Sequence, residues 1–248
     1  MALEATMREA LRLFKVALSF LTFFPVRSAE YRDGDLGRSA FCFPLVGALL
    51  GGMVWACYTV FAYLFPGTLL PPFAAVAVWV VFTGGLHLDG WADVCDALFS
   101  SSDPKVRQRA LKDSRIGVFG AAGVFFLLGI KVAAIYGADI SSLFILSAVV
   151  GRVSAIELGS LFSPRMGGLG EGFVGKVSKA TFFCWILACG VFACWLGGAA
   201  GALKIASTFI IIYLFGFILQ RSLGGIGGDG VGASIEFSEL AVLILWRL

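Results

Sequence analysis

From residue 69 to residue 99 the chain reads LLPPFAAVAVWVVFTGGLHLDGWADVCDALF, an apolar stretch that ends in ionisable side chains. A helix needs about 20 apolar residues to cross a bilayer, and the first part of this stretch nearly supplies them. The second part contains His87, Asp89, Asp93 and Asp96. A carboxylate at the centre of a membrane helix costs about 2.5 to 3.5 kcal/mol, so acids at such a boundary are typically paired, bound to cations or functional.

The spacing of the three aspartates predicts a cation site. Residues at i, i+4 and i+7 lie on one face of an α-helix, so Asp89, Asp93 and Asp96 are expected to project into one small volume. Three carboxylates that close together repel one another unless a cation lies among them.

The composition predicts an all-α, polytopic membrane protein in a single domain covering residues 1–248. Of the 248 residues, 59% are hydrophobic and 14% are charged, and the mean hydropathy of +0.92 is too high for a soluble domain. No alternating strand pattern is present, which favours a helical bundle over a barrel. About six to seven membrane-spanning helices are expected, the seventh depending on the short tail 240–248. The six firmer spans are 41–65, 69–88, 118–137, 140–162, 181–203 and 205–222.

The N-terminal segment predicts an amphipathic helix that lies in the membrane interface. Leu3, Met7, Leu11 and Phe14 recur at helical spacing, and the charged side chains fall elsewhere on the helix. A cleaved signal peptide is disfavoured because Glu4 lies where such a peptide is basic.

The distribution of basic residues predicts the orientation. With six spans, the N-terminus and the segments after the second, fourth and sixth spans share one side, and they hold most of the 19 lysines and arginines. These include Arg8, Arg12, Lys15, Arg27, Arg32, Arg38, Lys105, Arg107, Arg109, Lys112, Arg115, Arg165, Lys176, Lys179 and Arg221. By the positive-inside rule this side is cytoplasmic, so we expect a multi-pass protein of the cell (inner) membrane with its active face in the cytoplasm.

A short basic helix is expected directly after the acidic stretch. Asp103 followed by Pro104 is typical of a helix start, and Lys105, Arg109 and Lys112 then recur at i, i+4 and i+7. Such a stripe can lie against anionic lipid headgroups, or it can hold the phosphates of a substrate whose metal the carboxylates bind.

The segment SPRMGGLGEGFVGKVSK, residues 163–179, superficially fits a P-loop from Gly170 to Lys176. Val177 stands where a P-loop has its magnesium-binding Ser or Thr, and the segment follows an apolar helix where a strand is required, so we reject that interpretation. The glycines still allow backbone N–H groups to approach a phosphate.

Four further ionisable groups leave alternatives open. Arg152 and Glu157 lie inside a predicted span, where they pair with each other or with groups on other helices. Alternatively, Arg152 faces the same cavity as the aspartates. The late segment GGIGGDGVGASIE, residues 224–236, carries Asp229 and Glu236 in a flexible glycine setting, as cation ligands or as parts of a polar turn.

Together these features favour metal-assisted transfer at a phosphate. Magnesium would orient phosphate oxygens, while Lys and Arg would neutralise charge on the leaving group. His87 is the single histidine. It suits capping or orientation of another group better than a role as general base.

Four motifs, GGLHLDGWADVCDALF, LKDSRIGVFG, PRMGGLGEGF and GGIGGDGVGASIE, resemble the cobalamin synthase family, the adenosylcobinamide-GDP ribazoletransferases. The resemblance runs from FLTFFPV near the N-terminus to Glu236. It implies an Mg²⁺-dependent phosphotransferase that joins adenosylcobinamide-GDP to α-ribazole or its 5′-phosphate, releases GMP and yields adenosylcobalamin or its 5′-phosphate. Partners would be these substrates and the lipid bilayer, with no nucleic acid; the oligomeric state is not indicated.

The resemblance implies that Asp89, Asp93 and Asp96 bind Mg²⁺ on the pyrophosphate, with Lys112, Asp113 and Arg115 nearby. A ribose hydroxyl would attack the phosphorus attached to cobinamide. The resulting hypothesis names His87, Lys112, Arg115 and Arg152 as catalytic residues. It names as substrate-binding residues Asp113, Arg109, Arg165, Gly170, Asp229 and Glu236. Ser163 and the extra glycine that follows Met166 depart from the family pattern, which leaves the roles of Arg165 and Glu171 open.

Two alternatives were weighed against this assignment. A CDP-alcohol phosphotransferase shares the Asp89-Gly90 step, but its Ala-Arg pair and its two later aspartates are missing here. A membrane transporter would be expected to repeat the acidic motif in its second half, and no second copy occurs.

Overall fold

The computed structural model describes residues 2–24, 26, 32–137, 141–166 and 169–248. Arg27, whose position entered the orientation argument, therefore lies outside the described residues. Within those ranges the chain is all-helical and forms no β-strand, so the all-α part of the predicted fold class is confirmed. The helices are α1 (Ala2–Leu21), α2 (Asp35–Ser39), α3 (Phe43–Leu64), α4 (Leu70–Phe82), α5 (Leu86–Ser100), α6 (Pro104–Ala110), α7 (Val118–Ile135), α8 (Ser141–Leu161), α9 (Lys179–Leu223) and α10 (Gly228–Leu245), with 3₁₀ turns η1 (Ala40–Cys42) and η2 (Leu169–Gly172).

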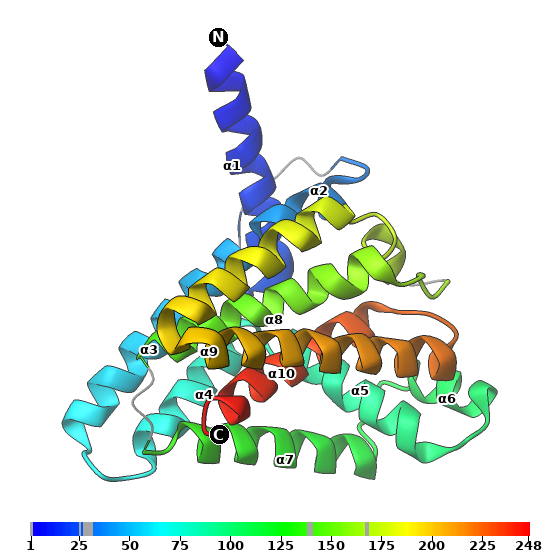
Figure 1. Ribbon diagram of the computed structural model, residues 1–248. Coiled ribbons are helices and arrows are strands. Elements are labelled where there is room, and N and C mark those ends of the chain that lie inside the picture. Colours follow the sequence, from blue (N-terminus) through cyan, green and yellow to red (C-terminus); the bar gives the residue numbers. More distant parts are fainter. Residues whose placement is uncertain (1, 25, 27–31, 138–140, 167–168) are drawn as a thin grey trace.

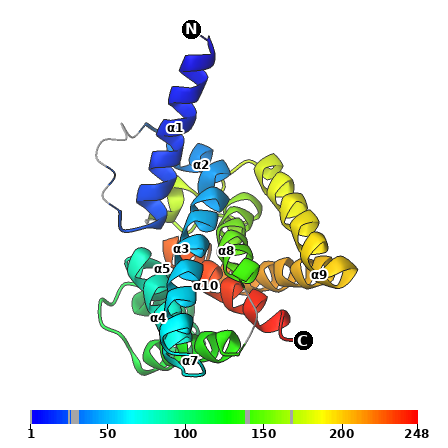
Figure 2. The ribbon, with the colours of Figure 1, turned by 90° about the vertical axis from the view of Figure 1, so that its left-hand side faces the viewer.

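Helices α8 and α10 form the centre of the bundle. Helix α10 contacts α5, α7, α8 and α9, and α8 lies between α10 and α3 (Figures 1 and 2). The approach of α3 to α8 depends on two glycines. A Cβ on Gly47 would lie 2.5 Å from the carbonyl oxygen of Ala148, and one on Gly51 would lie 2.6 Å from Cα of Ile145. Small residues four apart are the usual device for such close packing between membrane helices.

Four helical segments are long and apolar enough to cross a membrane among the described residues: Asp35–Leu64, Val118–Ile135, Ser142–Leu161 and Lys179–Leu223. A fifth results if α4 and α5, which meet at an angle of 92°, count as one broken span. The molecule therefore has the features of a membrane protein, whereas the predicted six or seven spans and the interfacial N-terminal helix stay predictions.

The predicted span 69–88 is not one straight helix. Helix α4 ends at Phe82, and the chain turns at Gly84 and Gly85, whose φ angles of +63° and +71° favour glycine. Helix α5 then begins at Leu86. The turn gives the acidic stretch a direction of its own, so the aspartates lie on a separate helix instead of at the end of a spanning one.

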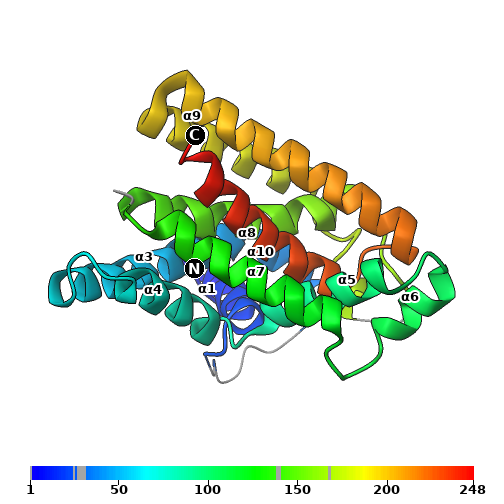
Figure 3. The ribbon, with the colours of Figure 1, turned by 90° about the horizontal axis from the view of Figure 1, so that it is seen from below.

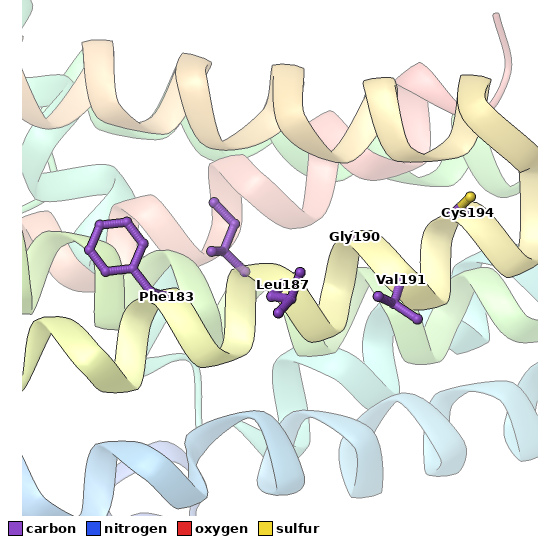
Figure 4. Close-up of a pocket in the computed structure, with 6 residues that line it drawn as sticks. Phe183, Leu187, Gly190, Val191 and Cys194 are labelled. Atoms are coloured by element: carbon purple, nitrogen blue, oxygen red, sulfur yellow. The ribbon is translucent and has the colours of Figure 1, made fainter.

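Helix α9 contains both of the predicted spans 181–203 and 205–222. Its helical geometry breaks at Gly197 and Gly198, where Gly198 has a φ of +61°, and the chain folds back there into two arms (Figures 1 and 2). The turn was predicted at residues 202–204, a few positions too late. Figure 4 shows the first arm, where exposed Phe183, Leu187 and Val191 lie around a shallow depression. Such a surface suits contact with lipid tails.

Helix α10 is the main structural element that sequence reasoning missed. The segment 224–236 was interpreted as flexible, yet from Gly228 it forms one continuous helix that extends to Leu245. Nearly all of its side chains from Val231 to Leu243 are buried, and in Figure 3 it crosses between α7 and α9. The helix was missed because its glycines are poor helix formers and interrupt the hydrophobic pattern. In the folded chain these glycines allow close packing against neighbouring helices.

Helix α1 is fixed to α2 by a group of charged side chains. Arg12 Nη2 donates to Glu9 Oε1 at 2.8 Å and to Asp35 Oδ1 at 2.8 Å, and Arg38 Nη2 lies 3.0 Å from Glu9 Oε1. Hydrogen bonding from Arg12 lowers the pKa of Glu9 to about 2, so this carboxylate stays ionised at all physiological pH values. The N-terminal turns of α1 project away from the bundle (Figure 1).

Candidate active site

A cavity of about 290 Å³ gathers side chains from segments that are far apart in the sequence. Phe20 of α1, Leu111 and Phe173 contribute apolar walls. The other lining residues come from α5, from Lys112, from the segment that contains Arg165 and η2, and from α10. Six of the predicted site residues line this one cavity: His87, Asp89, Lys112, Arg165, Gly170 and Asp229.

Glycine contacts explain why these segments meet. A Cβ on Gly90 would lie 2.7 Å from the carbonyl oxygen of Asp229, so α5 and the start of α10 cross with their backbones in near contact. A Cβ on Gly170 would lie 3.0 Å from the backbone of Gly227. Larger side chains at either position would push the acidic helix, the glycine-rich segment and α10 apart.

Backbone hydrogen bonds hold Arg165 and Asp229 beside each other. The N–H of Arg165 donates to the carbonyl oxygen of Ile226, and the N–H of Ile226 donates to that of Ser163, both at 2.9 Å. Arg165 Nη2 then donates to Asp229 Oδ2 at 2.9 Å. This ion pair is about three-quarters buried, and it sets the position of one cation and one carboxylate in the cavity.

Two of the predicted metal-binding aspartates are unpaired. Within the described residues, neither Asp89 nor Asp93 receives a hydrogen bond or forms an ion pair. Asp93 is partly buried and is subject to the negative charges of Asp89, Asp229 and Asp96, and the charge of Arg165 offsets them only in part. An arrangement of this kind favours a bound cation.

The donor chemistry fits Mg²⁺, although no three His, Cys, Asp or Glu side chains in the described ranges already form a metal cage. Mg²⁺ commonly binds proteins through one or two carboxylates and completes its octahedron with water and substrate phosphates. Asp89 and Asp93, one helical turn apart on α5, supply such a pair.

Asp96, the third predicted ligand, is engaged by the backbone. Its Oδ2 accepts the N–H of Gly117 at 2.7 Å and its Oδ1 accepts the N–H of Gly120 at 2.8 Å. These N–H groups belong to the start of α7, where a carboxylate is stabilised by the free donors and the helix dipole. Asp96 thereby fixes the end of the segment that carries Lys112.

Three predicted residues of the basic segment, Arg109, Asp113 and Arg115, do not line the cavity. Asp113 and Arg115 form an exposed pair, with Arg115 Nη2 donating to Asp113 Oδ2 at 2.8 Å, and this bonding lowers the pKa of Asp113 to about 2. Arg109 is exposed on α6. The start of α6 was predicted correctly, because Asp103 accepts the N–H of Lys105 at 2.8 Å, but the helix ends before Lys112.

Arg152 and Glu236 belong to a buried network. Lys131 Nζ lies 2.6 Å from Glu236 Oε2 and 2.7 Å from Glu239 Oε2. Arg152 also pairs with Glu239, which accepts a hydrogen bond from Trp79 at 3.0 Å as well. We call Lys131, Arg152, Glu236 and Glu239 the buried charge network.

Pairing with another helix is confirmed for Arg152, which bonds to Glu239 of α10. Pairing of Arg152 with Glu157 is not found, and Glu157 Oε2 has no hydrogen-bond partner within the described residues. The expectation that Arg152 faces the cavity is also not met. Sequence reasoning missed Lys131 and Glu239. Lys131 is a charged residue inside an apolar segment, and such a residue indicates either a buried ion pair or a functional group. This signal could have identified it.

His87 lies between the cavity and the buried charge network. It lines the cavity and is only 3% exposed, and the charges of Arg152 and Lys131 act on it. Its Nδ1 has no hydrogen-bond partner in the described part of the chain. A buried ring nitrogen without a partner beside a cavity is available to a ligand.

Comparison with known proteins identifies the family. A family model described as cobalamin-5-phosphate synthase matches residues 13–247. The chain belongs to this family. Its relatives include an adenosylcobinamide-GDP ribazoletransferase of Clostridium botulinum, 31% identical over 249 residues that cover 96% of this chain and 98% of that protein. A protein of the same name in Escherichia coli K12 is 34% identical over 243 residues, covering 94% of this chain and 98% of that protein.

No solved structure matches the chain. The resemblance expected from the four sequence motifs is confirmed, and its relatives are transferases by name. These findings favour the cobalamin synthase assignment over the CDP-alcohol phosphotransferase and the transporter.

Proposed function

We propose that this member of the cobalamin-5-phosphate synthase family joins adenosylcobinamide-GDP to α-ribazole or its 5′-phosphate. The observation that carries the proposal is the cavity lined by Asp89, Lys112 and Arg165, with unpaired Asp93 one helical turn from Asp89 on α5. The chain around it matches the family over residues 13–247. Acids that need a cation, beside bases that suit phosphate, are the components of metal-assisted phosphoryl-type transfer.

The proposed reaction breaks one phosphoanhydride bond and forms one phosphoester bond. A ribose hydroxyl of the ribazole attacks the phosphorus attached to cobinamide, the bond from that phosphorus to the bridging oxygen breaks, and GMP leaves with that oxygen. Asp89 and Asp93 would hold Mg²⁺, which would neutralise charge on the pyrophosphate. Lys112 and Arg165 bind phosphate oxygens, and Asp229 orients Arg165 through their ion pair.

His87 is the proposed acceptor of the hydroxyl proton. It is positioned to act because it lines the cavity, and no hydrogen bond among the described residues occupies its ring. General bases of this kind contribute about a hundredfold to ten-thousandfold to a rate. His87→Gln is therefore expected to lower kcat while leaving the KM values of both substrates close to those of the parent.

The apolar wall of the cavity suits the flat base of the ribazole. Phe20 and Phe173 line it, and their ring centroids lie 6.1 Å apart with planes inclined by 29°. The cavity volume of about 290 Å³ accommodates a nucleoside but is small for a corrin macrocycle. We therefore place the ribazole inside the cavity and the corrinoid at its mouth.

The proposed location is the cell inner membrane, with the cavity open to the cytoplasm and α1 in the interface. The segments that supply Lys112, Arg165 and Asp229 are those predicted on the basic side. A cysteine placed at exposed Ser102, in a variant otherwise without cysteine, tests this orientation. Labelling by an impermeant reagent only after the cells are opened is expected, and labelling of intact spheroplasts would reverse the proposed topology.

The decisive experiment is the product assay. Purified protein in lipid, supplied with Mg²⁺ and adenosylcobinamide-GDP, is expected to release GMP only when ribazole or its phosphate is added. Omission of the metal is expected to stop the reaction. Release of GMP without ribazole, or no release with all components and a folded protein, would contradict the proposed function.

A further inference from the structure

A second cavity, of about 770 Å³, lies on the other side of α5 from the candidate active site. It is bounded by α5, α7, the second arm of α9 and α10, and we call it the α5 groove. Its walls are almost wholly apolar, and the aromatic side chains among them are Trp91, Phe99, Phe119, Phe126, Phe215 and Phe237. None of the residues proposed for the reaction lines it.

Helix α5 lies between the two cavities, and opposite faces of the helix line them. Asp89 lines the candidate active site, and Asp93, one turn further along, shares its face. Trp91, Cys95 and Leu98, at i, i+4 and i+7, line the α5 groove. What fills the groove therefore packs directly against the helix that carries the acids.

The groove opens on a surface that has the character of a lipid-facing one. Phe126 of α7 is 61% exposed, Ile218 of α9 is 50% exposed, and both line the groove. Helices α7 and α9 are among the segments apolar and long enough to cross a membrane. A groove on such helices lies next to acyl chains, which are the apolar solvent of a membrane protein.

One end of the groove carries a positive charge. Arg107 of α6 lines it, near Ser222 at the end of α9. Arg107 Nε donates to the carbonyl oxygen of Ser101 at 2.6 Å, and no hydrogen bond or ion pair in the described ranges uses its terminal nitrogens. The α5 groove, with apolar walls and one arginine, therefore suits a molecule that has an apolar tail and an anionic head.

We propose that the α5 groove binds one acyl chain of an anionic phospholipid, with the lipid phosphate at Arg107. The bound chain would complete the packing on the apolar face of α5 and so support the helix that carries Asp89 and Asp93. This inference stands apart from the proposed reaction, because it concerns lipid binding and uses other residues.

The first test fills the groove. Ala122 of α7 lines it and is partly buried, whereas neighbouring Ala121 is exposed and does not line it. Ala122→Trp should block the acyl chain, and Ala121→Trp is the matched control. Native mass spectrometry of protein extracted from phosphatidylglycerol vesicles is expected to show one retained lipid in the parent and in the control, and none in Ala122→Trp. Equal retention in both variants would overturn the proposal.

The second test addresses the head group and leaves the groove walls intact. Arg107→Gln is compared with Lys105→Gln, an exposed neighbour on the same helix that does not line the groove. In vesicles with equal phosphatidylglycerol and phosphatidylcholine, the parent and Lys105→Gln should retain the anionic lipid at least about fivefold over the zwitterionic one. Arg107→Gln should retain both equally. An unchanged preference in Arg107→Gln, or a bound mass equal to a second copy of the chain, would overturn the proposal.

Discussion

The molecule holds two groups of acids, and they differ in whether the protein itself neutralises them. In the candidate active site Asp89 and Asp93 have no cationic or hydrogen-bonding partner within the described residues. In the buried charge network, Glu236 and Glu239 are matched by Lys131 and Arg152 at short range. The network balances its two acids with two bases of the protein, whereas Asp89 and Asp93 have no such partner and would be neutralised by the proposed cation. This difference separates a structural cluster from a binding site more clearly than burial or residue type does.

Breaking the network should give the largest effect, and the effect should fall on stability. Lys131→Met leaves Glu236 and Glu239 without their shared cation, which is expected to destabilise the fold by about 3 to 5 kcal/mol. Thermal unfolding in detergent measures it.

The compensated variant Lys131→Met with Glu236→Gln is the control, because removing one charge of each sign should recover part of the loss. If the single variant is as stable as the parent, the network contributes nothing to the fold.

Removing an unpaired acid should leave the fold intact and abolish turnover. Asp93→Asn is expected to lower the rate of GMP release by about a hundredfold to a thousandfold, because a carboxylate that holds the metal on the pyrophosphate is lost. The melting temperature should not fall, since Asp93 makes no described bond and its repulsion by nearby acids is relieved. Exposed Asp33→Asn is the matched control. Full activity in Asp93→Asn would remove this residue from the metal site.

The apolar wall of the cavity should affect one substrate only. Phe20→Ala is expected to raise the KM for ribazole by about fivefold to a hundredfold, since stacking of a base on an aromatic ring is worth about 1 to 3 kcal/mol. The KM for adenosylcobinamide-GDP should hardly change, and Phe20→Tyr should behave as the parent. A larger effect on the KM for adenosylcobinamide-GDP would place that substrate, not ribazole, against Phe20.

Asp96 tests the boundary between the two groups, because it lies on the acidic face but is bonded to the start of α7. Asp96→Ala is expected to cost about 0.5 to 2 kcal/mol of stability, the usual range for losing a helix cap. Turnover should fall less than in Asp93→Asn. A loss of turnover equal to that of Asp93→Asn, with unchanged stability, would show that Asp96 acts as a metal ligand rather than as a cap.

Local patterns in the sequence predicted the elements that depend on local physics. The spacing of Asp89 and Asp93 placed them correctly on one helix, and Asp103 with Pro104 marked the start of α6. The bend before Leu86 and the partner of Arg152 were not predictable in this way. Both are set by packing between distant segments: Glu239 is 87 positions from Arg152 in the sequence.

The same limit explains the site. Lys112, Arg165 and Asp229 were recognised as chemically suitable, but their convergence depends on backbone contacts at Gly90 and Gly170, which no residue pattern reveals. Helix α10 was missed because its glycines lower helix propensity. Only the packed structure shows that these glycines allow neighbouring backbones to approach closely.

The backbone pairing of Ser163 and Arg165 with Ile226 has a practical consequence for engineering. The chain lines the cavity up to Phe173 and again from Gly228, so both arms of α9 form an excursion between two cavity segments that are already joined by backbone hydrogen bonds. The far end of this excursion, at Gly197 and Gly198, has open space around both glycines. A fluorescent tag or a second chain terminus introduced there would lie at the tip of the excursion, with the cavity left intact. The bend of α9 is thus the natural position at which to split this enzyme into two reassembling fragments.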